Sequence, residues 1–595
     1  MNKSLRRVYL FGLIALLIAC NQPAPKTASQ QVSFSSLLKN YYEQSLKLYP
    51  LQATQNGDNR YNDLLPNNLT VAFRNQEHQF YQSYADSLKM YDRSKLDSTD
   101  QMSFDVLQWE TQINLERLQF HEELMPINQF WSLTITMGQL GSGTYTQPFK
   151  TVKDYDNFLS RVNGFTVWCD TAIANMRRGM AQGYVLPKIL AERVQPQLKA
   201  MIVTEPTQSL FYTPIKNLPT DFSDADKKRL TDAYTKAISG QLVPSYQKLY
   251  DFFVKEYTPA CKESAGISAI PNGKEYYNFL IKEWTTTDLT ADSIFNLGMN
   301  EVNRIQGEME QIKERVGYKG DLKSFLNYLR TDKQFFPFKT DSDVIQRFRK
   351  IYVTEKPQVD KLFTTQPKSR FEIRETEKFR AASASAEYQE GTPDGSRPGI
   401  FYVPIVDATK YNDVGMETLF LHEAIPGHHF QNSLQIESTT LPDFRKFIWY
   451  GAYGEGWALY CESLGDSLGL YTDPYQKFGN LSEEMHRAIR LVVDVGMHTK
   501  GWTREQAIQF SLDHEAEPEA DITTEIERYM AIPGQALSYK IGQLNILQLR
   551  AEAQQQLGSK FNWGNFHEEI LKNGCLPLSV LDADFNLWLS KQKGT

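Results

Sequence analysis

Three histidines and one glutamate lie within the eight residues from His422 to His429, and Glu423 directly follows the first histidine. Histidine nitrogen and carboxylate oxygen are ligands that zinc prefers, and a catalytic zinc site has three protein ligands and an open position for water. The usual helical arrangement is HExxH, with two histidines one turn apart and the glutamate directed at the bound water. The segment therefore predicts a zinc (Zn2+) site with His422 as a ligand and Glu423 as the general base.

The second histidine departs from this arrangement, because position 426 is proline and the next histidines are His428 and His429. On a straight helix a residue six positions further lies about 9 Å along the axis. Two nitrogens bound to one zinc lie only about 3–3.5 Å apart. Pro426 interrupts the helical ladder, and Gly427 tolerates unusual φ. A loop of two residues would present His428 and a loop of three would present His429; we predict His428.

A third metal ligand must come from another part of the chain. The segment 453–462 (YGEGWALYCE) carries Glu455 and Glu462 seven positions apart, so both share one face if the segment is a helix. About 10 Å of axial rise separates them, and only one can bind the metal directly. The other can hydrogen-bond a ligand histidine and fix its tautomer. The residues alone leave open which glutamate has which role.

Most of the chain from Phe34 onward carries helical spacing of apolar residues. The clearest helical stretches are 72–92, 100–120, 152–182, 224–256, 290–315 and 342–354. Residues 370–374 (RFEIR) alternate like a strand, and 399–404 (GIFYVP) is a short apolar strand. We predict a mainly α fold, in which a large helical body has a small β-sheet beside the metal-binding helix. We also expect 399–403 to be an edge strand that pairs with an extended peptide.

The N-terminus predicts export and lipid anchoring. Lys3, Arg6 and Arg7 precede an apolar run from Val8 to Ala19, which is too short to span a bilayer comfortably as a mature helix. The run ends in LIAC, which resembles a bacterial lipobox and implies cleavage before Cys20 and acylation of that residue. We expect an exported bacterial lipoprotein of the cell envelope, anchored in the membrane through Cys20. Without Asp after the cysteine, we expect the outer membrane if the source is Gram-negative.

The chain divides into four predicted parts. They are a signal peptide (1–19), the lipidated Cys with a flexible tether (20–33), an N-terminal helical half (34–270) and a catalytic half (271–595). The turn at 271–273 (PNG) marks the last boundary, and we expect the two halves to form one continuous body. The chain is 41% hydrophobic, has a formal net charge of -7 and has no basic block, so we expect no nucleic-acid partner. The sequence does not set the oligomeric state.

Five segments in the C-terminal third resemble the motifs of a bacterial family catalogued as domain of unknown function 885, which is assigned to the zincin-like metallopeptidases. They are PDGSRPGIFYVP (393–404), HEAIPGHHFQ (422–431), YGEGWALYCESLG (453–465), RLVVDVGMHTKGWTREQAI (490–508) and RYMAIPGQALSYKIG (528–542). Their order is also similar to that in thimet oligopeptidase and neurolysin. In those enzymes a glutamate beyond the second histidine binds zinc, and another follows seven residues later. The resemblance implies Glu455 as the zinc ligand and Glu462 as the residue that supports a ligand histidine.

The resemblance implies a zinc-dependent hydrolase of the oligopeptidase or carboxypeptidase type that cleaves peptide bonds. Glu423 would take a proton from a zinc-activated water and pass it to the leaving amine. Related peptidases stabilise the oxyanion with Tyr or His from a later helix, so Tyr539, Tyr529 and His498 are the candidates here. Two alternatives remain: a zinc amidase on a non-peptide or cell-wall amide, and a non-catalytic helical binding lipoprotein.

Several basic residues are candidates to hold the carboxylate of a peptide substrate, because arginine binds carboxylates through two parallel hydrogen bonds. They are Arg397, Arg487, Arg490, Arg528 and Lys540.

Overall fold

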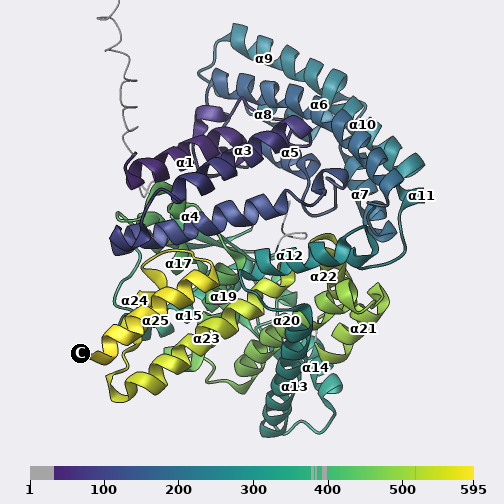
Figure 1. Ribbon diagram of the computed structural model, residues 1–595. Coiled ribbons are helices and arrows are strands. Elements are labelled where there is room, and N and C mark those ends of the chain that lie inside the picture. The colour runs from purple at the N-terminus through teal and green to yellow at the C-terminus, as the bar shows by residue number, and fades with distance from the viewer. Residues whose placement is uncertain (1–31, 377–380, 382–384, 392–397, 516, 595) are drawn as a thin grey trace, which may run out of the picture.

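The computed structural model describes residues 32–376, 381, 385–391, 398–515 and 517–594. The expected signal peptide (1–19), Cys20, most of the expected tether (20–33) and Arg397 lie outside these residues. Figure 1 shows the N-terminal elements, coloured purple to blue, above a second group of helices coloured teal to yellow. Within the described ranges, no helix combines the length and the apolar character that a membrane crossing needs.

The N-terminal group consists of helices joined by connections of different lengths. Its helices are α1 (Phe34–Leu48), α2 (Pro50–Gln55), α3 (Val71–Leu88), α4 (Ser98–Arg117), α5 (Leu133–Gly141), α6 (Val152–Gln182), α7 (Lys188–Ala200), α8 (Thr213–Lys216), α9 (Asp224–Ala237), α10 (Val243–Phe252) and α11 (Thr258–Ala260). Local sequence explains where the longest one starts and stops. Thr151 and Asp154 form a capping box at the start of α6, and Gly183 ends it with φ 85°.

The second group carries the site and begins at the predicted 271–273 turn. Its helices are α12 (Gly273–Thr285), α13 (Ala291–Arg315), α14 (Leu322–Thr331), α15 (Asp341–Leu362), α16 (Met416–Glu423), α17 (His428–Glu437), α18 (Asp443–Lys446), α19 (Gly451–Glu462), α20 (Pro474–Thr499), α21 (Arg504–His514), α22 (Glu519–Ala531), α23 (Ser538–Leu557), α24 (Trp563–Leu571) and α25 (Leu578–Gly594). The predicted fold class, a large and mainly α-helical body with a small sheet, is confirmed.

Two large hydrophobic clusters form the core, and each draws side chains from both sides of residue 271. In the first cluster Val106 of α4 is buried together with Trp457 of α19. In the second, Phe158 of α6 is buried together with Val492 of α20 and Tyr529 of α22. The division of the chain at residue 271 remains a prediction.

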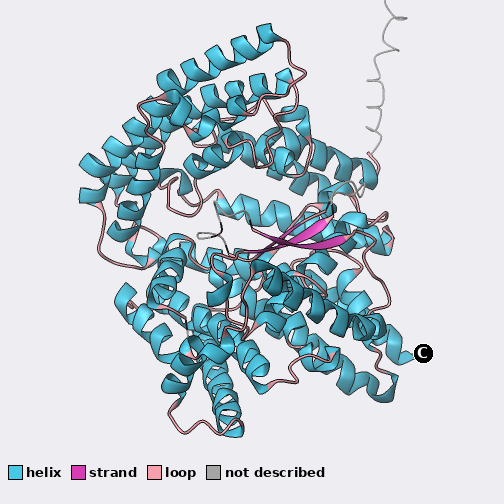
Figure 2. Ribbon diagram, turned by 180° about the vertical axis from the view of Figure 1, so that it is seen from behind, coloured by secondary structure: helices cyan, strands magenta, loops and turns pink. Residues whose placement is uncertain are grey.

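The sheet has three short strands, drawn in magenta in Figure 2: β1 (Phe371–Glu375), β2 (Glu387–Gln389) and β3 (Gly399–Val403). Their order is β1-β3-β2, with β1 parallel and β2 antiparallel to β3. The expectation that 399–403 is an edge strand is wrong, because β3 is paired on both sides. Strands β2 and β3 lie against α17, which places the sheet beside the second histidine of the site.

Candidate metal centre

The chain between His422 and His428 leaves the helix instead of looping out of a continuous one. Helix α16 ends at Glu423, and α17 begins at His428. The backbone at Ala424 (ψ -107°) and at Gly427 (ψ -128°) is not helical. A Cβ atom on Gly427 would lie 2.0 Å from the carbonyl oxygen of His422, so this close turn needs glycine. The turn brings the two histidines together although six positions separate them.

The turn is hydrogen-bonded to a neighbouring helix. The indole Nε1 of Trp457 donates a hydrogen bond to the carbonyl oxygen of Pro426 at 2.9 Å. The Cys461 thiol lies 3.5 Å from the same oxygen. Both residues belong to α19, which also carries Glu455. A single helix therefore holds the turn before the second histidine and supplies the third donor.

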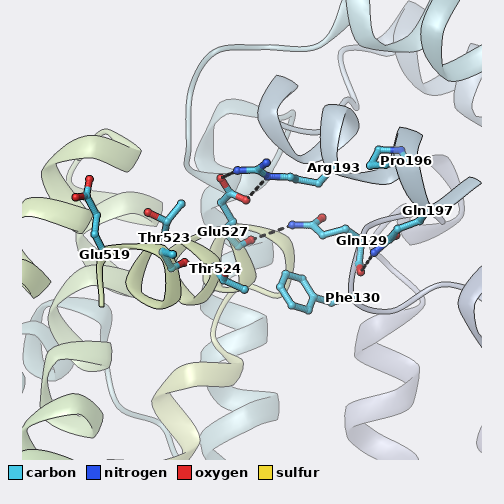
Figure 3. Close-up of a pocket in the computed structure, with 10 residues that line it drawn as sticks. Gln129, Phe130, Arg193, Pro196, Gln197, Glu519, Thr523, Thr524 and Glu527 are labelled. Carbon is cyan, nitrogen blue, oxygen red and sulfur yellow. Dashed lines mark hydrogen bonds and ion pairs between the residues drawn. The ribbon is translucent and has the colours of Figure 1, made fainter. Parts of the chain in front are cut away.

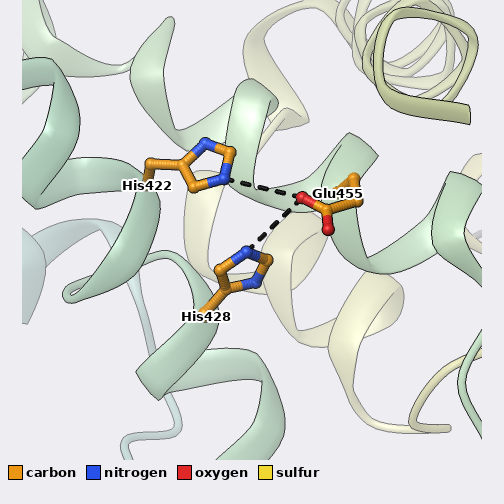
Figure 4. A group of neighbouring side chains, drawn as sticks. All are labelled: His422, His428 and Glu455. Carbon is orange, nitrogen blue, oxygen red and sulfur yellow. Dashed lines mark ion pairs between the residues drawn. The ribbon is translucent and has the colours of Figure 1, made fainter. Parts of the chain in front are cut away.

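His422, His428 and Glu455 form a group of potential metal ligands, shown in Figure 4. The Nε2 atom of each histidine lies 3.5 Å from Oε2 of Glu455. The three donor atoms all lie within 4.8 Å of one another. Donors bound about 2.1 Å from a tetrahedral zinc are separated by about 3.5 Å. The type and spacing of these donors therefore fit a zinc ion.

Glu462 contacts the other side of the first histidine. Its Oε1 lies 2.7 Å from Nδ1 of His422, and the side chain is only 2% exposed. Glu455 and Glu462 thus meet the same imidazole at its two different nitrogens. This explains how glutamates seven positions apart on α19 both serve one site. Hydrogen bonding of Nδ1–H to Glu462 leaves the Nε2 lone pair free for a metal.

The charges within the group are strongly coupled. Burial alone would lower the pKa of His422, but Glu455 and Glu462 outweigh burial and raise it to about 10. Burial alone would raise the pKa of Glu455, but His422 and His428 hold it below its usual range. The carboxylates therefore attract positive charge at this point, and a divalent cation would supply that charge in place of the histidine protons.

Glu423 lies at the end of α16, directly after His422, and is half-buried. Burial raises the pKa of Glu423, while the neighbouring charges of His422, His428 and Arg487 act against the rise. A carboxylate with a raised pKa can accept a proton and release it again at neutral pH. This is the chemistry that a general base beside a metal needs.

His429, the alternative second ligand, lies outside the donor group. Its Nδ1 lies 2.9 Å from the hydroxyl of Tyr388 on β2, and its ring packs against Phe371 of β1 with 4.9 Å between centroids. Burial lowers the pKa of His429 to about 4, so the ring is neutral at physiological pH. The structure thus directs His428 toward Glu455 and His429 toward the sheet.

Tyr529 and His498 are bonded to other groups. The Tyr529 hydroxyl donates to Glu525 at 2.8 Å and accepts from Nε of Arg490 at 2.9 Å. His498 is buried, with Nδ1 accepting from the backbone N–H of Ile267 and Nε2 donating to the carbonyl of Tyr529. Burial lowers the pKa of His498 to about 4. Neither residue has a free polar group to offer a substrate.

Tyr539 differs, because its hydroxyl has no hydrogen-bond partner among the described residues. The parallel packing of α23 on α19 indicates its place. Gly542 lies directly against Gly456, where an added Cβ would meet the opposite backbone at 2.5 Å. One residue further on, Gln543 donates to the carbonyl of Leu459 at 3.2 Å. At the start of α19, a Cβ on Gly451 would lie 3.2 Å from the hydroxyl of Ser538. This register places Tyr539 beside the first turn of α19, about one turn before Glu455.

Trp449 is a neighbour of the site that the sequence did not reveal. Its indole lies 5.9 Å from the ring of His428 and is 43% exposed. It covers Gly454, where an added Cβ would lie 2.0 Å from the indole. Gly454 and Gly456 flank Glu455 inside a helix, where glycine is unfavourable. That costly pattern was the available signal that other groups pack closely on both sides of Glu455.

Two cavities open elsewhere on the molecule. A cleft of about 880 Å³ lies between the two groups of helices and is lined by aromatic residues that include Trp131, Tyr276 and Trp284. Trp284 lies near Gly451 at the start of α19, the helix that carries Glu455. The second cavity, about 850 Å³ and shown in Figure 3, lies between α7 and α22 beside the Arg193–Glu527 ion pair. None of His422, His428 and Glu455 lines either cavity.

The chain is similar to known proteins over most of its length. The structure of a candidate lipoprotein from Colwellia psychrerythraea matches with 28% identity and a TM-score of 0.86, over 94% of this chain and 99% of that chain. A lipoprotein-like protein of unknown function from Shewanella oneidensis matches with 20% identity and a TM-score of 0.74, over 94% of this chain and 100% of that one. The second likeness is one of fold alone. No curated protein is significantly similar.

The family relationship rests on a match that covers far more than the five motifs. The sequence model of a family described as "Bacterial protein of unknown function (DUF885)" matches residues 50–584. The match includes α2 to α11 of the N-terminal group as well as the metal centre. This chain is therefore a member of the DUF885 family.

Proposed function

We propose that this protein is a zinc-dependent peptidase of the bacterial cell envelope. The observation that carries the proposal is the convergence of His422, His428 and Glu455 next to Glu423. Two imidazole nitrogens that each lie 3.5 Å from the same carboxylate oxygen suit zinc. The carboxylate of Glu423 follows the first ligand directly and has a raised pKa.

A zinc ion bound to these donors would act as a Lewis acid and make a water molecule more acidic. Glu423 accepts the proton of the attacking water and passes it to the nitrogen of the scissile amide. The carbon–nitrogen bond breaks, and the C-terminal fragment leaves as a neutral amine. Glu462 keeps Nδ1 of His422 protonated, so that the ring stays in one orientation and one tautomer.

Tyr539 is the best placed donor for the oxyanion that forms on the substrate carbonyl. It is half-buried, its hydroxyl is unengaged among the described residues, and its neighbour Ser538 lies against Gly451 at the start of the helix that carries Glu455. The hydroxyl of Tyr529 already bonds Arg490 and Glu525. His498 has both nitrogens bonded to the backbone. We therefore assign oxyanion stabilisation to Tyr539 and structural roles to the other two.

The proposed location rests on the N-terminus and on the relatives. The LIAC sequence and the description of two structural relatives as candidate lipoproteins support a lipid anchor at Cys20. Acylation at this position would hold the helical body at the surface of a membrane, which we take to be the outer membrane in a Gram-negative cell. The proposed substrates are peptides that reach this compartment.

Digestion of a peptide library tests the activity directly. The purified full chain is assayed for bound zinc by elemental analysis, and cleavage positions are read by mass spectrometry. We expect about one zinc per chain and peptide cleavage that Glu423→Gln lowers by 10²-fold or more, because it removes the general base. The variant should keep its zinc, since Glu423 is not one of the three donors.

The outcomes separate the proposal from its alternatives. Cleavage of a non-peptide amide without any peptide cleavage would favour a zinc amidase that acts, for example, on cell-wall amides. A protein without zinc, whose properties Glu423→Gln leaves unchanged, would be a binding lipoprotein. Either result would overturn the peptidase assignment.

A further inference from the structure

Helix α20 presents a buried polar stripe to the segment that carries Tyr529 and Tyr539. At one end Glu484 accepts from the amine of Lys540 at 2.6 Å. In the middle Arg490 contacts Tyr529. Further along, Asp494 accepts from the backbone N–H of Gly534 at 3.2 Å. The same stripe includes Arg487, one turn before Arg490.

The two arginines of this stripe belong to the helix that packs against α16, which carries His422 and Glu423. The guanidinium of Arg487 is one of the charges that act on the pKa of Glu423. The guanidinium of Arg490 lies 4.4 Å from the centre of the Tyr539 ring. Ser538, the residue before Tyr539, lies against Gly451 at the start of the helix that carries Glu455. Arg490 therefore contacts the proposed oxyanion donor, and Arg487 lies one turn before Arg490 on the same helix.

Each arginine has a buried donor without a partner among the described residues. These donors are Nε of Arg487 and one terminal nitrogen, NH1, of Arg490. Arg490 is 6% exposed, and its other two nitrogens bond Tyr529, Glu525 and His486. An unpaired donor on a buried charge is costly. The two open donors point to an anionic partner that the protein itself does not provide.

The other basic candidates within the described ranges are bonded to groups of the protein. The amine of Lys540 is completely buried and bonds Glu301, Glu484 and Gln543. The terminal nitrogens of Arg528 bond Glu525 and Gln535. Among the candidates within the described ranges, only Arg487 and Arg490 keep a buried donor without a partner.

The direction of the reaction places a substrate group at this point. Glu423 delivers its proton to the leaving amine, which belongs to the C-terminal fragment of the peptide. That fragment must therefore lie on the side of Glu423, and Arg487 belongs to the helix that packs against α16. Guanidinium groups recognise carboxylates strongly. A short C-terminal fragment carries one such group, its terminal carboxylate, close to the scissile bond.

We propose that Arg487 and Arg490 bind the free C-terminal carboxylate of the peptide, so that the protein removes residues from the C-terminus and does not cut at internal positions. This inference rests on the proposed peptidase function. It names the substrate class as peptides with a free, unblocked C-terminus. Longer peptides are substrates through their last residues only.

A matched pair of N-acetylated peptides tests the inference on the unchanged protein. The two peptides have one sequence and end in a free acid or in an amide. With the zinc-loaded full chain we expect kcat/KM for the acid to exceed that for the amide by about 100-fold, because the amide offers no charge to the arginines. Mass spectrometry should place the cut near the C-terminus. Equal rates, or internal cuts in both peptides, would overturn the inference.

Substitutions then assign the effect to residues. Arg487→Met and Arg490→Met should each lower kcat/KM for the acid by about 10-fold or more and leave the amide unchanged, so the acid-to-amide ratio falls. Arg528→Gln removes a neighbouring charge whose donors are already bonded, and it should keep the wild-type ratio. An equal loss for both peptides would indicate another role for the arginines and would refute carboxylate binding.

Failure of the inference is distinct from failure of the proposed function. Wild-type protein that binds zinc but cleaves neither peptide nor any library member would contradict the peptidase assignment itself. Wild-type protein that cleaves the amide as fast as the acid would leave the peptidase assignment intact and refute only the carboxylate site. The wild-type comparison decides the question even if an arginine variant fails to fold.

Discussion

At the level of single residues, the first histidine is the most constrained group of the site. His422 faces Glu455 through Nε2 at 3.5 Å and Glu462 through Nδ1 at 2.7 Å. A neutral imidazole can donate from only one nitrogen, and the other then offers a lone pair. Since the bond to Glu462 is the shorter one, the lone pair falls on the side of Glu455 and His428. Glu462 thus determines which nitrogen is available to a metal.

The substitution Glu462→Gln should weaken zinc binding while the fold persists. The amide can still accept the Nδ1 hydrogen, but without the negative charge that makes the ring a stronger ligand. Loss of such a supporting contact typically costs about 10- to 100-fold in metal affinity. Competition with a chelator measures the zinc dissociation constant. Glu423→Gln is the matched control and should keep wild-type affinity; wild-type affinity in Glu462→Gln would contradict the assigned role.

At the level of elements, the contact between α19 and α23 sets the position of the third metal donor. Gly456 and Gly542 lie opposite each other, and a Cβ on Gly542 would lie 1.7 Å from the carbonyl oxygen of Ala452. The two helices therefore approach as closely as their backbones allow. Ser538 also lies against Gly451 at the start of α19, so a change in the helix spacing would move Tyr539 relative to the helix that carries Glu455.

We predict opposite effects for two Gly→Ala substitutions in helices. Gly542→Ala should destabilise the protein by about 1–3 kcal/mol, because the added methyl group forces α19 and α23 apart. Gly307→Ala in α13, where no atom lies within 4 Å of the added carbon, should stabilise it by up to about 1 kcal/mol through helix propensity. Urea unfolding measures both values. Equal changes in unfolding free energy would show that the contact between Gly456 and Gly542 does not limit how closely α19 and α23 pack.

The elements were predictable to different extents, for physical reasons. Helical periodicity is local, so the predicted stretch 152–182 coincides with α6, and 290–315 nearly coincides with α13. Strand pairing is not local. The central position of β3 depends on β1, which lies 28 positions earlier in register, and the apolar pattern of 399–403 fits a central strand as well as an edge strand.

In the candidate site, too, local features could be predicted from the sequence and contacts between distant segments could not. The Pro426–Gly427 pair predicted a distortion, and the structure brings His428 to the donor group by ending one helix and starting another. The contacts of Trp449 and of the α20 stripe could not be predicted in this way. They join side chains from helices whose relative placement no local pattern specifies. In the sequence, only the glycines on either side of Glu455 indicated that other groups pack closely against α19.

At the level of the whole molecule, α20 passes between both hydrophobic clusters and links them to the site. Leu491 and Val495 belong to one cluster, and Val492 belongs to the other. Between these apolar residues Asp494 is fully buried, and it accepts hydrogen bonds from the Tyr277 hydroxyl of α12 and from Gly534. Burial raises the pKa of Asp494 from its ordinary 3.8 to about 7.

This buried acid predicts a pH dependence of global stability. Because the folded-state pKa lies above the unfolded value, the folded protein holds the extra proton, and its stability falls as pH rises from about 4 to 7. In Asp494→Asn this contribution is absent. Between pH 5 and pH 8 the unfolding free energy of the wild type should fall by about 2 kcal/mol more than that of the variant. Urea unfolding at the two pH values measures the change; the same pH dependence in both proteins would contradict it.

The hydrogen bond from Trp457 to Pro426 affects how the site would capture its ion. The turn before His428 is fastened to α19, and α19 itself carries Glu455. A flexible chelator loses conformational entropy when its arms close around a metal. In this protein folding already orders the segments that carry the ligands. The conformational entropy is therefore lost when the chain folds and not when the metal binds. The three ligands are therefore preorganised for the metal. The affinity of the site for the metal depends mainly on the exchange of the ion's hydration water for protein donors.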